Sequence, residues 1–230
     1  MIDDNDIKKI IKDSLGMSTN KSVIEETLVA QEKVFNLKTE LLSTSTKESH
    51  IELYENYLKQ FNIISAQLDN ANRSESNSTH STYRSLKCDE TYNMNAIYLH
   101  ELYFANISDL HSQIQMDSLS YMRLSRDFGT FDDWQRDFIA CCMASQCGWA
   151  MTYFNFFTQT FMNTFIDLHS LNVPVFGYPV IVMDMWQHAY YRDYLNHPKE
   201  YVIGMMKQLN WNVIESRITK ADKVQKALRG

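Results

Sequence analysis

The chain has 230 residues, of which 22 are Lys or Arg and 28 are Asp or Glu, so its formal net charge is −6. Nucleic-acid binding depends on basic patches, and no Lys/Arg-rich run is present, so we expect no nucleic-acid partner. Only 6 glycines and 3 prolines punctuate the sequence, which argues against an all-β fold with many tight turns and favours helices. No apolar run approaches the ~20 residues that a membrane-spanning helix needs.

The first 32 residues are acidic and helix-prone. Apolar residues recur at helical spacing over residues 7–15 and again over residues 20–35. A third helical pattern covers about residues 46–68. Residues 69–87 are rich in Ser, Asn and Thr and show no periodicity, so they are predicted to form a loop that joins two helices.

The middle of the chain continues with helical patterns over residues 93–106 and 114–126. Thr130, with an acidic residue three positions later, resembles an N-cap followed by an acidic first turn. The helix that begins there is predicted to end near residue 146.

From residue 148 onward the composition changes. Aromatic and β-branched residues in partial alternation predict a β-hairpin. Residues 179–186 form a short, continuous apolar run that is typical of a buried central strand. A helical pattern then covers about residues 187–209. A helical N-terminal half is therefore expected to precede an α+β C-terminal half.

The four cysteines form no CxxC pair, so a cysteine zinc site is not expected. They are Cys88, Cys141, Cys142 and Cys147. The sequence begins with acidic residues and lacks the basic start and apolar stretch of a secretory leader. We therefore expect reduced core thiols in a soluble, intracellular protein that is not secreted.

Asp184 and His188 directly follow the apolar run. Ionisable side chains at the end of a buried strand are costly unless they are paired or bind a metal. An Asp oxygen and a His nitrogen suit a borderline ion such as Fe, Mn or Zn. The alternative is a strand end that reaches water, with an ordinary surface histidine.

The residues around this pair resemble a known family. The segment DMWQHAYYRDY, residues 184–194, resembles the signature DxWEHAYYxDY of the iron/manganese superoxide dismutases. Three shorter segments agree with that family, FGT at 128–130, GWA at 148–150 and NW at 210–211. The resemblance covers about residues 33–217.

The resemblance implies four metal ligands. Asp184 and His188 match the family's two C-terminal ligands, and the segment HELYFANI places His100 at the second ligand position. His50, seven residues before Tyr57, matches the first ligand on the same helix face. The implied cofactor is one iron or manganese ion per chain, because three imidazoles and one carboxylate suit a redox ion with positions left for water and substrate.

The resemblance also implies roles for residues around the ligands. Tyr57 would be the gateway acid and hydrogen-bond relay. His169 would orient the solvent at the metal, because Ala96 stands where the family usually has a glutamine. The walls of the site are expected to be Trp149, Trp186, Tyr98 and Phe104.

Two residues of the signature segment, Gln187 and Tyr191, are also expected to lie around the ligands. In the family a glutamate normally stands at the position of Gln187 and crosses the dimer interface to hold the partner's ligand histidine. A neutral amide can still form a hydrogen bond, but it lacks the charge.

The implied fold is α+β, with a long helical hairpin at residues 33–113 and an α/β metal-binding domain at residues 114–217 that contains a three-stranded antiparallel sheet. A helical extension at residues 1–32 precedes them, and a tail at residues 218–230 follows. The implied activity is metal-dependent disproportionation of superoxide to dioxygen and hydrogen peroxide.

An alternative stays open, in which the chain is a structural subunit of a large assembly, such as a virion or organellar complex, with weak or no activity. The extension lies outside the resemblance, and Gln187 weakens the usual dimer contact. We therefore expect a homo-oligomer or a larger protein assembly that the extension contacts.

Overall fold

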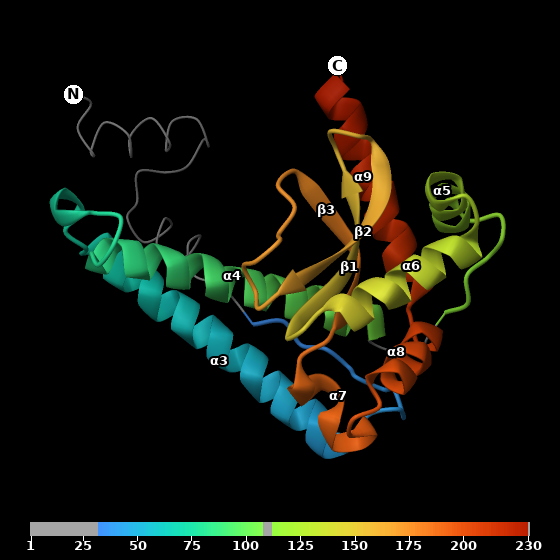
Figure 1. Cartoon of the computed structure of the whole chain (residues 1–230), viewed down its shortest axis with the longest axis horizontal. Helices are drawn as coiled ribbons and strands as arrows, with labels where there is room; N and C mark the ends of the chain where they lie inside the picture. Colours follow the sequence, from blue (N-terminus) through green and yellow to red (C-terminus); the bar gives the residue numbers. More distant parts are fainter. Residues whose placement is uncertain (1–31, 108–111, 230) are drawn as a thin grey trace.

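The computed structural model describes residues 32–107 and 112–229. Figure 1 shows a long helical hairpin beside a small twisted sheet. The hairpin consists of α3 (Thr44–Asp69) and α4 (Thr82–Ile107), and the sheet of β1 (Gly148–Asn155), β2 (Thr160–Asp167) and β3 (Gly177–Asp184). The strands pair antiparallel in the order β2-β1-β3. The predicted α+β class, with a helical hairpin before a three-stranded antiparallel sheet, is confirmed.

The other described helices pack against the sheet, against the hairpin or against each other. They are α5 (Leu119–Phe128), α6 (Phe131–Ala144), α7 (Gln187–Tyr194), α8 (Pro198–Lys207) and α9 (Trp211–Arg229). The α5 and α6 helices contact β2, and α6 also contacts β1, whereas α4 and α9 contact β3. The α7 helix packs on α3 and α8, which brings the end of β3 against the hairpin (Figure 1).

The hairpin helices present one buried face each. Ser43 begins α3, because its hydroxyl oxygen accepts a hydrogen bond from the main-chain nitrogen of Thr46. Buried residues then recur at intervals of four along each helix, as expected for one face. In α3 these include His50, Tyr54 and Leu58, and in α4 they include Ala96, His100 and Phe104.

Two predictions for the N-terminal half need correction. The loop predicted at residues 69–87 is shorter, because α4 begins at Thr82. Ser81 caps it by accepting a hydrogen bond from the main-chain nitrogen of Arg84 at 3.2 Å, so a serine that suggested a loop is a helix start. The pattern at residues 7–15 lies outside the described residues, as does most of the pattern at 20–35, and the described part of the latter is not helical.

The next two helices are bounded by their caps. The α5 helix begins later than the predicted range 114–126, because the Ser118 side chain accepts a hydrogen bond from the main-chain nitrogen of Tyr121. The predicted N-cap at Thr130 is confirmed, with its hydroxyl oxygen 3.0 Å from the main-chain nitrogen of Asp133. The α6 helix ends close to its predicted end.

The central strand is β1, not the run at residues 179–186 that was predicted to be central. That run lies mostly in β3, which is an edge strand. It is apolar because α4 and α9 cover it. Residues Gly148–Phe154 of β1 are all buried. The glycine at its start is required by a close approach, since a Cβ atom there would lie 1.9 Å from the main-chain oxygen of Ile166.

The helix predicted at residues 187–209 is two helices, α7 and α8. Leu195 has a φ of 50°, which ends α7 in a left-handed conformation. Pro198 then occupies the first turn of α8, where its missing N–H costs nothing. The α9 helix continues beyond residue 217, where the tail was predicted to begin.

Arg217 fastens α9 to the rest of the core. Its buried guanidinium donates hydrogen bonds to the main-chain oxygens of Leu102 and Val180 and to the side-chain oxygen of Asn106. Burial lowers the pKa of Arg217 to about 10. Three acceptors on two elements therefore hold α4, β3 and α9 together.

The cysteines are free, as predicted, but they are not all in the core. Cys142 is buried, Cys141 and Cys147 are partly buried, and Cys88 is exposed on α4. Within residues 32–107 and 112–229, no helix has the length and apolar character needed to cross a bilayer.

Candidate metal centre

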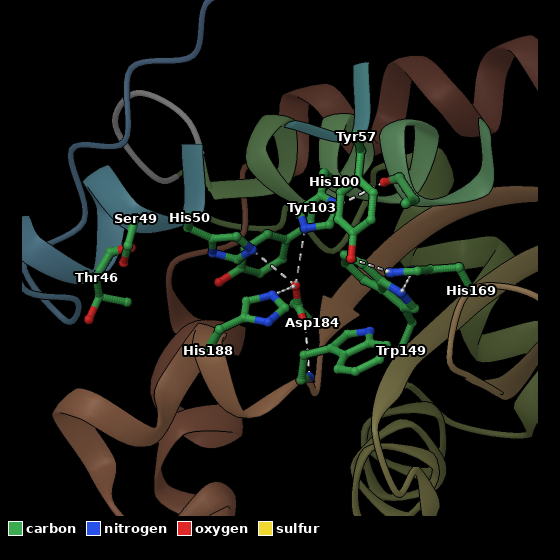
Figure 2. Close-up of polar contacts among 12 residues, drawn as sticks. Thr46, Ser49, His50, Tyr57, His100, Tyr103, Trp149, His169, Asp184 and His188 are labelled. Atoms are coloured by element: carbon green, nitrogen blue, oxygen red, sulfur yellow. Dashed lines mark hydrogen bonds and ion pairs between the residues drawn. The ribbon is translucent and has the colours of Figure 1, made fainter. Parts of the chain in front are cut away.

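Four side chains from four elements converge on one point (Figure 2). His50 comes from α3, His100 from α4, Asp184 from the end of β3 and His188 from the first turn of α7. The Nε2 atoms of His50, His188 and His100 lie 3.0, 3.4 and 3.9 Å from Oδ2 of Asp184. One possible ligand atom from each residue lies within 4.8 Å of all the others. The structure thus brings together the four residues predicted as ligands.

Local hydrogen bonds aim two of these side chains. Nδ1–H of His100 donates to the main-chain oxygen of Ala96 at 2.7 Å, one helical turn earlier. This fixes the tautomer and leaves Nε2 as the unprotonated nitrogen that faces the cluster. Oδ1 of Asp184 accepts a hydrogen bond from the main-chain nitrogen of Trp186 at 2.8 Å, so Oδ2 is turned towards the imidazoles.

Two buried tyrosines form a hydrogen-bonded pair that holds the main chain at Asp184. The Tyr201 hydroxyl donates to the main-chain oxygen of Asp184 at 2.9 Å. The Tyr103 hydroxyl lies 2.9 Å from the Tyr201 oxygen and donates to it, because the Tyr201 proton is already used. Burial raises the pKa of both phenols, so both remain protonated donors.

Burial and mutual attraction set the charges of the cluster. Burial lowers the pKa of His50, and it lowers the pKa of His100 to about 3. Burial alone would raise the pKa of Asp184, but the neighbouring His188 and His50 lower it by more. Near neutral pH the site therefore presents an ionised carboxylate to the buried, neutral imidazoles of His50 and His100.

This donor set fits one metal ion. Nε2 of His100 is buried and has no hydrogen-bond partner among the described residues, which is costly unless something else binds it. Three imidazole nitrogens and one carboxylate oxygen are donors that suit Fe or Mn. A cation between them would satisfy the unpaired nitrogen and the carboxylate charge together.

A hydrogen-bonded chain runs beside the cluster. Nε1–H of Trp149 donates to Nδ1 of His169 at 3.0 Å. Nε2 of His169 lies 3.1 Å from the hydroxyl oxygen of Tyr57. Burial lowers the pKa of His169 to about 4, so its ring is neutral at pH 7. The Tyr57 ring lies 5.5 Å from that of His100, which puts the chain next to the ligands.

Comparisons with known proteins decide the family. A sequence model of the C-terminal domain of the iron/manganese superoxide dismutases matches residues 118–217. The iron superoxide dismutase of Aquifex pyrophilus is 32% identical over 192 residues, which cover 82% of this chain and 89% of that protein. The iron enzyme of Cupriavidus metallidurans is 28% identical over 75% of this chain and 86% of its own length. A manganese superoxide dismutase of Haloferax volcanii is 27% identical over 57% of this chain and 65% of its own length.

The chain belongs to the iron/manganese superoxide dismutase family. The residues that match the model of the C-terminal domain include Asp184 and His188. The other two residues of the cluster, His50 and His100, come from the hairpin. In this superoxide dismutase homologue the cluster therefore exists only where the two parts of the chain meet.

Aromatic side chains enclose the cluster, with one correction to the predicted walls. The Trp149 ring lies 4.8 Å from that of His100, and the Phe104 ring lies 4.9 Å from that of His50. Trp186 stacks on His188 at 5.9 Å. Tyr98 is 43% exposed and does not line the site, because its position on α4 faces away from His100.

The predicted roles of Gln187 and Tyr191 around the ligands stay predictions, since the contact expected of Gln187 is with a second copy of the chain. Both are exposed on α7, and Tyr191 is 52% exposed. Among the described residues, neither side chain forms a hydrogen bond to the four clustered residues. Within one chain, both residues therefore lie on the surface of the molecule.

One neighbour of the site escaped the sequence analysis. The Tyr92 ring lies 4.6 Å from His169 and 6.5 Å from Tyr57. Tyr92, Ala96 and His100 recur every four residues in α4, so helical spacing from His100 could have placed Tyr92 on the same face. The approach of His169, which follows β2, could not be read from that spacing.

Proposed function

We propose that this protein is an iron- or manganese-dependent superoxide dismutase, which converts two superoxide anions and two protons to dioxygen and hydrogen peroxide. The convergence of His50, His100, Asp184 and His188 carries the proposal. Relatives named superoxide dismutase align over most of the chain, and this supports it. A metal ion bound there supplies a one-electron couple between its +3 and +2 states.

Tyr57, whose ring lies 5.5 Å from that of His100, is predicted to be the gateway acid beside the ligands. The resemblance suggested that His169 orients solvent at the metal, which stays a prediction. Both ring nitrogens of His169 are engaged, Nδ1 by Trp149 and Nε2 by Tyr57. These bonds support a role for His169 through Tyr57, whose oxygen it holds in place.

The aromatic walls keep bulk water away from the reacting centre. Trp149 and Phe104 are completely buried, and a site with little water strengthens every electrostatic interaction inside it. Only a small anion needs to enter. The value of kcat/KM in such a site can approach the diffusion limit of roughly 10⁸–10⁹ M⁻¹s⁻¹.

We also infer that the protein forms a homo-oligomer through the face of α7. Gln187 and Tyr191 are exposed on this short helix, which directly follows the end of β3. An exposed aromatic residue beside the metal ligand His188 is a natural contact for a second copy. A second copy at this face would cover the 31% of the His188 side chain that is exposed.

The experiment that tests the proposed activity measures bound metal and superoxide turnover in wild-type protein, His188→Ala and His197→Ala. His197 is an exposed histidine outside the cluster, so its variant is the matched control. We expect one iron or manganese ion per chain and rapid turnover in the wild type and the control. In His188→Ala, metal affinity and turnover should fall by more than the about 10–100-fold that results from removing a residue hydrogen-bonded to a metal ligand.

A wild-type protein that binds neither metal and shows no turnover would overturn the proposal and favour the structural-subunit alternative. Equal losses in His188→Ala and His197→Ala would also contradict it, because a general effect of removing a histidine would then explain both.

A further inference from the structure

A groove runs along an exposed face of α3, in the half of the helix that carries His50. Its volume is about 380 Å³. The apolar part of its lining consists of Ile51 from α3 and of Phe35 and Leu37 from the segment before it, and all three are only partly buried. The remaining lining residues are charged and belong to α3; they are Lys47, Glu48, Glu52 and Glu55. We call this feature the α3 groove.

The charged edge of the α3 groove is acidic. Glu48, Glu52 and Glu55 recur at intervals of four and three, so their exposed side chains lie on one face of the helix. Within residues 32–107 and 112–229, none of these three carboxylates forms an ion pair. Three glutamates and one lysine give the lining a formal charge of −2. A fitting occupant therefore has an apolar stripe with positive charge along its edge.

The α3 groove is separate from the contact of α3 with α7. Arg192 of α7 donates hydrogen bonds to the hydroxyl oxygens of Ser45 and Ser49, at 2.7 and 3.4 Å. Neither serine lines the groove. The α7 face inferred above as the contact for a second copy thus leaves the groove open to a different occupant.

The sequence of residues 7–15 has the complementary pattern. At helical spacing its apolar stripe consists of Ile7, Ile11 and Leu15. Lys8 and Lys12 each follow a residue of the stripe by one position, so they flank it on one side. Three lysines and one aspartate give residues 7–15 a formal charge of +2. The other apolar pattern, at residues 20–35, has three glutamates and two lysines and is therefore unsuited to an acidic edge.

The described chain begins beside the groove, which puts residues 7–15 within reach. The main-chain nitrogen of Lys33 donates to the hydroxyl oxygen of Tyr54 at 3.1 Å, and its ammonium group pairs with Glu101. Phe35, two residues later, already lines the groove. The roughly 20 residues that separate Leu15 from Phe35 can span at most about 70 Å, whereas the whole of α3 is only about 39 Å long.

We propose that residues 7–15 dock in the α3 groove of their own chain, with the apolar stripe against Ile51 and the flanking lysines beside the three glutamates. Exposed ion pairs contribute little affinity, so the apolar stripe supplies most of the binding and the charges select this segment over others. A tether of this length gives an effective concentration on the order of millimolar, so a modest affinity is enough. The inference is independent of the proposed activity.

The first test is carbodiimide crosslinking of the full-length protein, which joins an amine to a carboxylate only where the two groups touch. Mass spectrometry should find Lys8 and Lys12 joined to the three glutamates of the groove. Lys9 is the internal control, because helical spacing turns it away from the stripe. The absence of these crosslinks, or an equal yield from Lys9, would overturn the proposal.

A denaturing gel of the same crosslinked sample identifies the occupant. The product that contains these crosslinks should have the mass of one chain. If it has the mass of two chains, the groove binds residues 7–15 of a second copy. That result would overturn docking within the same chain.

The second test compares Ile11→Gln with the matched control Lys9→Gln by hydrogen–deuterium exchange. Ile11→Gln removes apolar surface from the stripe and leaves every charge in place. The main-chain amides of residues 7–15 should then exchange at least about tenfold faster, the equilibrium equivalent of losing one buried isoleucine side chain. Lys9→Gln should match the wild type, and equal exchange in all three proteins would overturn the proposal.

A charge exchange tests the pairing itself. The double variant Glu48→Lys/Glu55→Lys should speed the exchange of residues 7–15, because like charges then face each other. Adding Lys8→Glu and Lys12→Glu to that protein should restore slow exchange. If protection does not return when all four charges are reversed, the lysines are not beside these glutamates and the proposal is wrong.

Discussion

The surroundings of His169 keep its imidazole neutral, so this residue makes the stability of the folded protein depend on pH. Burial lowers its pKa to about 4, against an ordinary value of 6.5. Between these two pH values the unfolded chain binds more protons at this position than the folded protein does. Acidification through this window therefore favours unfolding, and stability rises again as the pH returns above 6.5.

The corresponding prediction compares wild-type protein with His169→Gln at pH 7.5 and pH 5. The glutamine amide can still donate to Tyr57 but does not titrate. The wild type should lose stability on acidification by on the order of 1 kcal/mol more than the variant. The ligand histidines are present in both proteins, so the difference between the two losses isolates His169. Thermal melts at both pH values measure it, and identical losses would contradict the neutral, buried state of this ring.

At the scale of elements, the close contact of β1 with β2 positions Trp149. Gly148 is the first residue of β1, and it pairs with Asp167. The next pair in the register to β3 places Trp149 opposite Asp184. The start of β1 therefore fixes the position of Trp149 in the wall of the site and its distance from the candidate ligand Asp184.

Gly148→Ala should destabilise the protein strongly, because the added Cβ would lie 1.9 Å from a main-chain oxygen and 2.9 Å from the Cα of Asp167. The paired control is Gly204→Ala, within α8, where the nearest atom is the end of the Leu41 side chain at 3.1 Å. There, alanine should cost little or stabilise by up to about 1 kcal/mol through its helix propensity. Thermal unfolding of both variants checks this, and a Gly148→Ala protein as stable as the control would refute the tight strand contact.

Most elements could be predicted from the sequence, but their ends and neighbours could not. Periodicity identified the hairpin helices, because one face of each is buried, and aromatic and β-branched composition identified the β-hairpin. A continuous apolar run shows that a strand is covered on both faces, and it does not give the strand order, so β3 was placed at the centre of the sheet. The break between α7 and α8 occurs at Leu195, where no glycine marks the left-handed conformation.

At the scale of the whole molecule, the metal centre depends on the docking of the hairpin against the C-terminal part. The segment before α3 helps to hold this arrangement. Phe35 packs against Phe104 with the ring centroids 5.5 Å apart. The main-chain nitrogen of Ser43 donates to the carboxylate of Asp193 at the end of α7. Contacts from this segment therefore reach both parts of the chain.

The candidate ligands could be predicted because the family resemblance extends over both parts of the chain. The sequence pattern alone related Asp184 to His188, which lie within one short stretch, whereas the resemblance was needed to relate His50 to Tyr57. Tyr92 could not be placed beside the site in this way, because its neighbour there, His169, lies 77 residues away in the sequence. Contacts of that kind follow from tertiary packing and not from local pattern.

The most direct test of the central claim is anomalous X-ray diffraction from crystals of the purified protein at the iron and manganese absorption edges. We predict one strong peak per chain, located between Nε2 of the three clustered histidines and Oδ2 of Asp184. The absence of a peak at this point, or a peak bound by other residues, would contradict the account.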